Sequence, residues 1–205
     1  SQVRILCDPP FIGHNISMKI KNTILTSFLF FLVLASWYVI RGIRNEMAVE
    51  NYRTFTKLSP PLRTEKDRIS VIKGLQDGTI DAIASDHMPQ DQDAKRLPFS
   101  QAEYGSVGLE TLLPLSLSLV KNNFLSIEKV FSLITSNPAK IINLDVGEIK
   151  KGNDADIIIF DENKPWKVNP DEFHSKSKNT PFDGMLVEGK NLMTFIRGRL
   201  VYKNL

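Results

Sequence analysis

A short apolar run that ends in an acid and an imidazole limits most strongly what this chain can fold into. The run is Thr79–Ser85, and Asp86, His87, Met88 and Pro89 follow it directly. Its length and composition predict a buried strand. In parallel α/β sheets and barrels, residues at the carboxyl ends of strands face the ligand site. Because a carboxylate there can bind a divalent metal and carry a proton, the run predicts hydrolytic chemistry at Asp86.

Helical patterns surround this run, so the chain from residue 45 onward is typical of an α/β domain. Apolar residues recur at helical spacing between Thr64 and Gln76, and Gly78 marks the end. Further helices are predicted for residues 107–121 and 127–134. Asn137 and Pro138 provide a cap and a first-turn proline for a short helix that ends near Leu144.

After Gly147 the pattern changes from helices to strands. Residues 156–160 predict a compact strand, and residues 185–188 and 192–196 predict a hairpin around Gly189 and Lys190, before a last strand at 200–202. We therefore expect a β-rich module over residues 146–205, which follows a helical part over residues 45–145.

Residues 1–44 differ in character from the rest. Residues 24–40 form an apolar run without a charge, with Lys19 and Lys21 before it and Arg41 and Arg44 after it. The run lies at the short end for a membrane-spanning helix, and it is also similar to a signal peptide that begins at Met18. Three interpretations stay open: a membrane-inserting segment, a buried segment, or a segment foreign to the domain, such as a frame-shifted reading.

The net charge and the cysteine content indicate which partners and which cellular compartment to expect. The net charge is +3, from 26 basic and 23 acidic residues. This excess is small and scattered, so nucleic-acid binding is not expected. The single Cys7 excludes internal disulfides and suits a reducing compartment. We expect a cytoplasmic location, with membrane association through residues 24–40 as the alternative.

Seven short motifs occur in a fixed order from residue 57 to residue 202. They are KLSPPLR (57–63), SDHMP (85–89), GLETLLP (108–114), TSNPAK (135–140), GNDAD (152–156), SKNTPF (177–182) and IRGRLVY (196–202). In this order and spacing, the chain from about Asn45 to Leu205 resembles the carboxyl-terminal half of a dihydroorotase, within the amidohydrolase superfamily.

The resemblance implies an α/β fold: the last units of a (β/α)8 TIM barrel, followed by a small β-sandwich module built from both chain ends. It also implies a zinc centre that activates water to open or close the cyclic amide of dihydroorotate. Asp86 matches the family's metal-ligating and proton-relaying aspartate. Tyr104 and Gly105 match the place where loop backbone meets the substrate. Ser59 and Gln90 stand at two further substrate contacts, where the family carries asparagine and histidine.

The family's other metal ligands should lie upstream, but residues 1–44 contain only His14 and no His-x-His pair. Because a zinc hydrolase needs about three protein ligands, we expect no zinc to be bound by this chain alone. We therefore expect a truncated dihydroorotase-like protein, inactive on its own. Two alternatives stay open: an active hydrolase completed by a separate amino-terminal half or by a homo-oligomer, and a membrane-anchored, non-catalytic interaction module.

Several polar residues near the motifs have simpler structural interpretations. We expect His87 to form structural hydrogen bonds, since the side chain next to Asp86 points the other way in an extended chain. His174 is expected at the surface, and Glu110 in a structural role at a helix start. A charged stretch with Asp91, Asp93, Lys95 and Arg96 is expected to be solvated, and its loop could act as a lid over a completed barrel.

Overall fold

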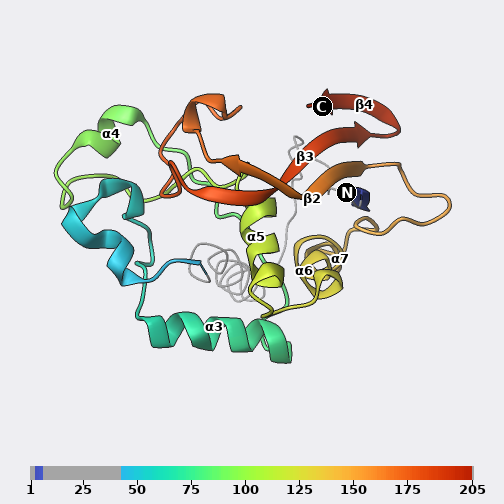
Figure 1. Cartoon of the computed structure of the whole chain (residues 1–205), viewed down its shortest axis with the longest axis horizontal. Helices are drawn as coiled ribbons and strands as arrows, with labels where there is room; N and C mark the ends of the chain where they lie inside the picture. The colour runs from blue at the N-terminus through green and yellow to red at the C-terminus, as the bar shows by residue number, and fades with distance from the viewer. Residues whose placement is uncertain (1–2, 7–42, 205) are drawn as a thin grey trace, which may run out of the picture.

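A four-stranded antiparallel sheet lies over a layer of helices in the computed structural model, which describes residues 3–6 and 43–204 (Figure 1). The strands follow the order β1-β2-β3-β4 in the sheet. Their bounds are Val3–Leu6 for β1, Ile157–Lys167 for β2, Leu186–Ile196 for β3 and Arg199–Lys203 for β4. An α/β architecture is therefore confirmed.

Both ends of the chain contribute to this sheet. Strand β1 runs antiparallel to β2, with Val3 opposite Asp161 and Leu6 opposite Ile158. The second sheet of a sandwich, and the barrel units themselves, stay predictions.

The hairpin turn lies in a different place from the predicted one. Gly189 and Lys190 fall inside β3, where Lys190 is paired with Asp161 of β2. The turn is at Arg197 and Gly198, whose φ angles are +50° and +74°. Two left-handed residues form the turn that best fits the twist of an antiparallel pair, so this pair, and not Gly189-Lys190, reverses the chain.

Gly189 instead provides the close approach between the sheet and helix α5, Leu112–Lys121. A Cβ atom at Gly189 would lie 2.3 Å from Cδ1 of Leu117, which is buried. The φ angle of Gly189 is +97°, a conformation that side chains other than glycine's rarely adopt. The β module and the helical part are thus packed together through a residue without a side chain.

The helices predicted within residues 64–76 and 127–134 are confirmed, whereas the helix predicted for residues 107–121 begins only at Leu112. Helix α3 spans Glu65–Asp77, with Thr64 and Asp67 in a reciprocal capping box and Gly78 in the left-handed conformation at its end. The remaining helices are α4 (Gln92–Arg96), α6 (Ile127–Ile134), α7 (Ser136–Ile141) and the 3₁₀ helices η1 (Glu46–Tyr52), η2 (Thr54–Thr56) and η3 (Pro170–Glu172).

The predicted cap of the short helix was wrong by two residues. Thr135 is the N-cap of α7, and Asn137 lies inside the first turn. The side-chain amide of Asn137 donates to the carbonyl oxygen of Asp81 across 2.9 Å. Asn137 therefore fastens the helix to the segment that precedes Asp86.

The run Thr79–Ser85 does not form a strand with a neighbour among the described residues. A strand needs a continuous ladder to a neighbouring strand, and this run has separate anchors: Ile83 N–H donates to the carbonyl of Leu133 at 2.8 Å. The nearest approach to parallel pairing is a single bridge between His87 and Ser106. Ala82 and Ile83 are buried, as expected for an inward-facing run.

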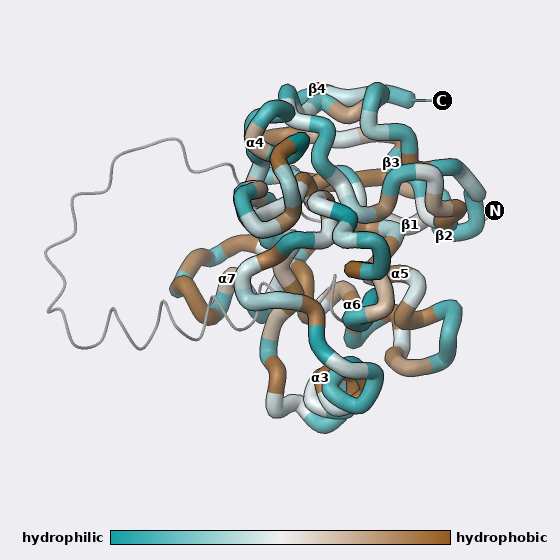
Figure 2. Tube along the Cα trace, turned by 90° about the vertical axis from the view of Figure 1, so that its left-hand side faces the viewer, coloured by the Kyte–Doolittle hydropathy of each residue, from teal (hydrophilic) through white to brown (hydrophobic). Residues whose placement is uncertain are grey.

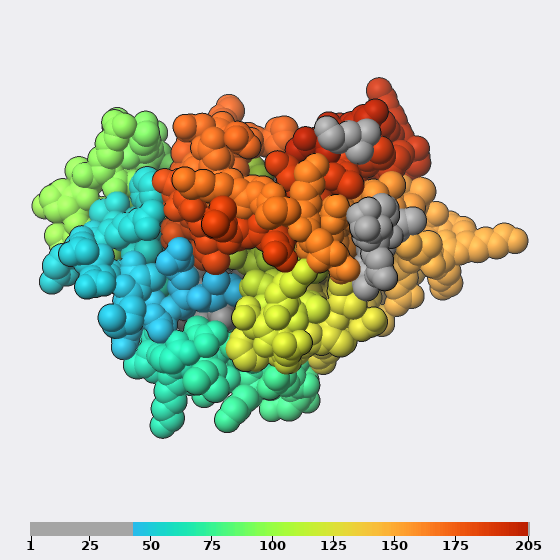
Figure 3. All heavy atoms as spheres, viewed as in Figure 1, coloured from blue at the N-terminus to red at the C-terminus, as the bar shows by residue number. Residues whose placement is uncertain are grey.

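One core joins the helices to the sheet side of the molecule. Its most buried members are Leu75, Val107, Leu115, Val130, Leu133 and Phe182. In both views α5 and α6 lie between the sheet and α3 (Figures 1 and 2). Figure 3 shows the β module, in orange and red, along one side of the helical part, in cyan to yellow.

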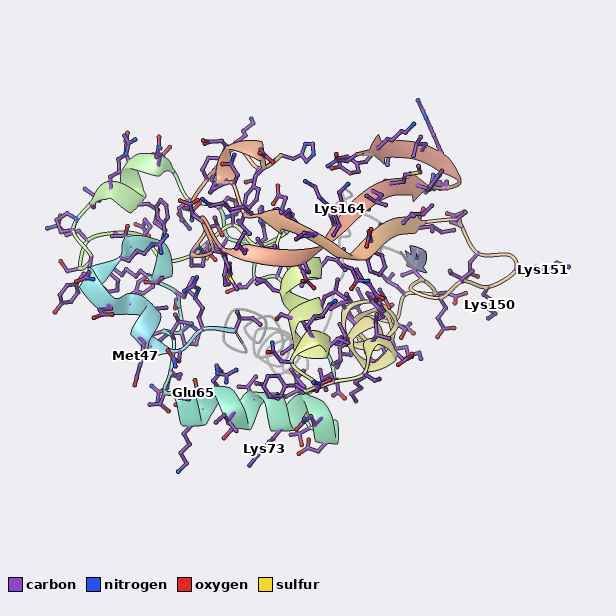
Figure 4. All side chains as sticks on the ribbon, viewed as in Figure 1. Met47, Glu65, Lys73, Lys150, Lys151 and Lys164 are labelled. Carbon is purple, nitrogen blue, oxygen red and sulfur yellow. The ribbon has the colours of Figure 1, made fainter. Side chains whose placement is uncertain are left out.

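The loop that leads from α7 to β2 projects from the packed body of the protein and carries Lys150 and Lys151 (Figure 4). In the described part of the chain, no helix has the length and apolar character needed to cross a membrane. The apolar run 24–40 and His14 lie outside the described residues.

Candidate active site

Asp86 has a left-handed backbone conformation. Its φ angle is +47°, in the left-handed region, and its side chain is half-buried. Gly108 lies very close to Ser85, the residue before Asp86. A Cβ atom at Gly108 would lie 2.4 Å from the carbonyl oxygen of Ser85. The segments around residues 85 and 108 therefore fix the backbone on both sides of the carboxylate.

His87 has the structural role expected from its position. Its Nδ1 atom accepts from the backbone N–H of Gly108 at 3.2 Å and from that of Leu109 at 3.4 Å. One residue further, the N–H of Met88 donates to the carbonyl of Ser106 at 2.8 Å. These bonds hold the Asp86 segment beside residues 106–109.

Asn179 connects two of the predicted substrate-contact residues. Only 2% of it is exposed. Its Nδ2 donates to the carbonyl of Gly105 at 3.2 Å, and its Oδ1 accepts from the backbone N–H of Gln90 at 3.2 Å. Its own carbonyl accepts from the N–H of Val107. One side chain therefore brings together the loop after Asp86 and the loop at Gly105.

Lys57 lies beneath the loop that carries Tyr104. Its Nζ donates to the carbonyl of Ser100 at 3.1 Å and lies 4.6 Å from the centre of the Tyr104 ring, a cation–π distance. Its carbonyl accepts from the N–H of Gly105 at 3.1 Å. Ser59, two residues along, is exposed. Tyr104 is 47% exposed, so part of its ring faces solvent.

The expectation of a fully solvated charged stretch was wrong for Lys95. Its exposed fraction is only 1%. Its Nζ donates to three backbone carbonyls, those of Thr54 (3.1 Å), Lys57 (3.3 Å) and Glu103 (2.6 Å). A buried ammonium needs acceptors on all sides, and three carbonyls provide them.

Burial, and then the like charge of Lys57, lower the pKa of Lys95 to about 8, against a smaller opposing effect of Glu103. Lys95 ties helix α4 to both Lys57 and the residue before Tyr104. The loop of residues 86–104 is therefore anchored to the body of the protein at this point.

Glu110 and His174 agree with their structural interpretations. The Oε1 atom of Glu110 accepts from the backbone N–H of Ser175 at 3.0 Å, just before α5. His174 is exposed, and its ring packs edge-on against Tyr202. Glu110 thus joins the start of α5 to the segment that leads to Asn179.

The described structure connects Asp86, Gln90 and Gly105 through short backbone links and Asn179, whereas Ser59 lies exposed beyond Lys57. Asn179 and Lys95 are the residues that sequence reasoning missed as parts of this site. A signal existed for Asn179, since it lies in the SKNTPF motif. No pattern distinguishes Lys95 from the exposed charges beside it, because its burial depends on carbonyls from distant segments.

The donor set of the described residues does not by itself fit a zinc ion. In that part of the chain, no three His, Cys, Asp or Glu side chains lie together in a way that could hold a metal. The Nδ1 atom of His87 is already an acceptor for two backbone N–H groups. Asp86 could contribute one ligand to a centre whose other ligands come from elsewhere.

Residues 42–201 match the family model described as the amidohydrolase family. The chain therefore belongs to the amidohydrolase family.

Within this family the chain is similar in sequence to dihydroorotases. It is 51% identical over 159 residues to the dihydroorotase of Anaplasma phagocytophilum (strain HZ), a match over 78% of this chain and 36% of that protein. It is 47% identical over 158 residues to the dihydroorotase of Desulforapulum autotrophicum, a match over 77% of this chain and 37% of that one. The chain thus spans little more than a third of the length of these relatives.

Solved structures of hydantoinases have a similar fold. L-hydantoinase (dihydropyrimidinase) from Arthrobacter aurescens superposes with a TM-score of 0.74 at 31% identity, over 80% of this chain and 38% of that one. D-hydantoinase from a Thermus species superposes with a TM-score of 0.72 at 21% identity, over 79% of this chain and 37% of that one. The second likeness shows the fold alone.

Proposed function

We propose that this chain supplies one side of the active site of a dihydroorotase-like hydrolase, and that it has no turnover by itself. The observation that carries the proposal is the position of Asp86: a half-buried carboxylate at a left-handed residue, fixed by backbone contacts to residues 106–109. The 51% identity to a dihydroorotase supports the choice of a cyclic amide as substrate.

Hydrolysis of a cyclic amide needs a base for the attacking water and an acid for the leaving nitrogen. One carboxylate can do both in turn: it accepts a proton from water as the oxygen attacks the amide carbon, and it returns that proton to the nitrogen as the C–N bond breaks. The carboxylate thus ends the cycle in its starting state, and the carboxylic acid formed from the amide loses its own proton to solvent. Asp86 is the residue to which we assign this role.

The loop at Tyr104 and Gly105 is the part of the chain that we assign to the substrate. Asn179 and Lys57 engage the carbonyl and the N–H of Gly105, which fixes the loop in place. A carbonyl oxygen has two lone pairs, so that of Gly105 can accept a second hydrogen bond from a substrate N–H. Ser59 and Gln90 are shorter or differently shaped than the family's asparagine and histidine, and so contribute weaker contacts.

The remaining ligands and strands of the site would come from the part of the relatives that this chain does not match. We propose that zinc would be held mainly by that part, with Asp86 as one ligand, and that a separate amino-terminal half or a second copy of the chain would complete the barrel. A small dihydroorotate-like molecule would be the substrate of the completed protein.

A complementation experiment tests this proposal. The unmatched portion of the Anaplasma phagocytophilum dihydroorotase is produced separately and mixed with this chain in the presence of zinc, and dihydroorotate hydrolysis is followed. We expect no turnover from this chain alone and measurable turnover from the complex. Turnover by the purified chain alone would contradict the first expectation, and a stable, zinc-loaded complex without turnover would contradict the second.

The role of Asp86 is tested in the same complex. Asp86→Asn removes the base but keeps the size of the side chain, and we expect turnover to fall about 100-fold or more. Asp145→Asn, a change of the same charge at an exposed residue, serves as the matched control and should retain turnover. Equal activity of both variants would exclude Asp86 from the chemistry.

A further inference from the structure

The ammonium of Lys95 is bonded to both segments that hold Tyr104 and Gly105, the pair of residues assigned above to the substrate. Its Nζ donates to the carbonyl of Glu103, directly before Tyr104, at 2.6 Å. It also donates to the carbonyl of Lys57 at 3.3 Å, and that same carbonyl accepts the N–H of Gly105 at 3.1 Å. Lys95 therefore fixes the acceptor of Gly105 as well as the residue where the pair begins.

Lys95 is itself held at both ends of its side chain. The hydroxyl of Thr54 donates to the carbonyl of Lys95 at 2.6 Å, and the Nζ of Lys95 donates back to the carbonyl of Thr54 at 3.1 Å. The N–H of Glu103 donates to the carbonyl of Ala94, next to Lys95, at 3.2 Å. Because these bonds run in both directions, the ammonium is a fixed point for the residues bonded to it.

Gly105 has little room to move while these carbonyls are fixed. It is buried at a φ angle of +113°, and a Cβ atom there would lie 2.7 Å from the carbonyl oxygen of Met88. The carbonyl oxygen of Lys57 has two lone pairs, which the N–H of Gly105 and the Nζ of Lys95 occupy. Without Lys95 this carbonyl would keep one donor only, and Lys57 and Gly105 could shift together.

The stability of the fold does not by itself explain a charge at this position. Lys95 is buried, and its acceptors are neutral carbonyls, not carboxylates. Removing a charge from water is costly, and an apolar side chain of similar volume is often as stable or more stable in its place. Burial, and then the like charge of Lys57, lower the pKa of Lys95 to about 8, so the folded protein disfavours the charged form. An ammonium here therefore indicates a role that an apolar side chain cannot fill.

We propose that Lys95 is a positioning residue, whose ammonium holds Tyr104 and Gly105 where the Gly105 carbonyl can accept a hydrogen bond from the substrate. The three N–H groups of the ammonium are matched by three carbonyls, so Lys95 acts through these two residues and does not touch the substrate. This inference rests on the proposed function, which assigns Tyr104 and Gly105 to the substrate.

Amide hydrogen exchange of the full chain, followed by NMR, tests the positioning without any turnover. Lys95→Met keeps an unbranched side chain and removes the donors, so we expect the N–H of Gly105 to exchange about tenfold faster or more. The N–H of Val107 is the internal reference, because it is bonded to the carbonyl of Asn179 and should keep its rate. Lys73→Met, the same change of charge at an exposed residue of α3, is the matched control and should alter neither rate.

Steady-state kinetics of the complemented hydrolase provide the second measurement. A displaced contact that binds substrate and transition state equally raises KM and leaves kcat unchanged, whereas a loss of folded protein lowers the apparent kcat. We expect Lys95→Met to raise KM for dihydroorotate about tenfold and to keep kcat within about threefold of the wild type. Lys73→Met should change neither constant.

Lys95→Gln replaces Lys95→Met if that variant fails to fold. It keeps two N–H donors on a shorter side chain, and it should speed exchange at Gly105 about threefold or more. The proposal is overturned if Gly105 exchanges at the wild-type rate in the variant, if Gly105 and Val107 accelerate equally, or if KM stays unchanged in an active complex. A wild-type complex without turnover contradicts the proposed function alone, and the exchange rates still decide whether Lys95 positions Gly105.

Discussion

The side-chain amide of Asn179 donates to the carbonyl oxygen of Gly105 across 3.2 Å, although 74 positions separate the two residues in the chain. The same side chain accepts from the N–H of Gln90. The β-rich part of the chain therefore orders two loops of the helical part, and the candidate active site depends on both.

Asn179→Ala should lower the free energy of unfolding by about 2–3 kcal/mol. The substitution leaves the carbonyl of Gly105 and the N–H of Gln90 without partners, each at a cost of about 1 kcal/mol or more. Urea unfolding followed by circular dichroism measures the change. Asn122→Ala is the matched control, because Asn122 is exposed and bonds only locally to Ser118, and its effect should stay within about 0.5 kcal/mol. Equal effects of the two substitutions would contradict the role of Asn179.

Gly189→Ala should destabilise the protein by about 2–4 kcal/mol. The new Cβ would lie 2.3 Å from Cδ1 of Leu117. The φ angle of +97° at residue 189 adds backbone strain for any residue with a side chain. Gly152→Ala separates the two causes: Gly152 has a φ of +100°, and a Cβ there would meet nothing within 4 Å, so this variant carries the strain alone. We expect Gly152→Ala to cost less, about 1 kcal/mol. A thermal or urea melt of both variants distinguishes the clash from the strain.

The sequence was most informative where local chemistry decides the structure. The helix predicted between Thr64 and Gln76, with its end at Gly78, agrees with α3, because helix ends depend on neighbours a few residues away. The hairpin was misplaced, because Gly189 and Arg197-Gly198 both carry turn signals and only the packing against Leu117 chooses between them.

In the candidate site, too, features set by nearby residues were predictable and features set by distant contacts were not. Asp86 was found from its position after an apolar run, and the order of motifs indicated the family. The anchoring of its loops was not predictable, since it depends on Lys95 reaching the carbonyls of Thr54, Lys57 and Glu103 across up to 41 positions of the chain. The sequence around a charged residue in a polar stretch does not indicate that distant carbonyl groups will accept its hydrogen bonds.

The stability of the protein should rise with pH because of Lys95. In the folded state the pKa of Lys95 is lowered to about 8, whereas the unfolded chain holds this proton to about pH 10.4. Between these values the unfolded state binds more protons, so the free energy of unfolding increases with pH there and is independent of this group below pH 8. One pKa unit corresponds to about 1.4 kcal/mol, so we expect a gain on the order of 1–3 kcal/mol over this range.

Comparison with Lys95→Met isolates this effect. Urea unfolding of both proteins at pH 7, 8, 9 and 10 gives the difference in stability, which should shift in favour of the wild type as the pH rises. Lys73→Met is the control, since Lys73 is exposed on α3 and points away from the body (Figure 4). A difference between wild type and Lys95→Met that stays constant with pH would show that Lys95 keeps an ordinary pKa.

Ser59→Asn and Gln90→His should raise the activity of the complemented protein. Both substitutions restore the residue types that the dihydroorotase family carries at these positions. Ser59 is exposed, and the backbone of Gln90, not its side chain, bonds to Asn179, so neither change disturbs the packing. A hydrogen bond to a charged substrate group contributes about 1.5–3 kcal/mol, so each change should raise kcat/KM about tenfold or more, mainly through a lower KM.

Gln101→His is the control for this pair, because Gln101 is exposed on the same loop and lies outside the motif. Steady-state hydrolysis of dihydroorotate by the complex gives kcat and KM for each variant. If Gln101→His raises kcat/KM as much as Gln90→His, a histidine anywhere on the loop is sufficient and Gln90 is not the contact. If neither Ser59→Asn nor Gln90→His lowers KM, both side chains point away from the substrate, and the segments that carry them position the loop of Asp86 without binding the cyclic amide.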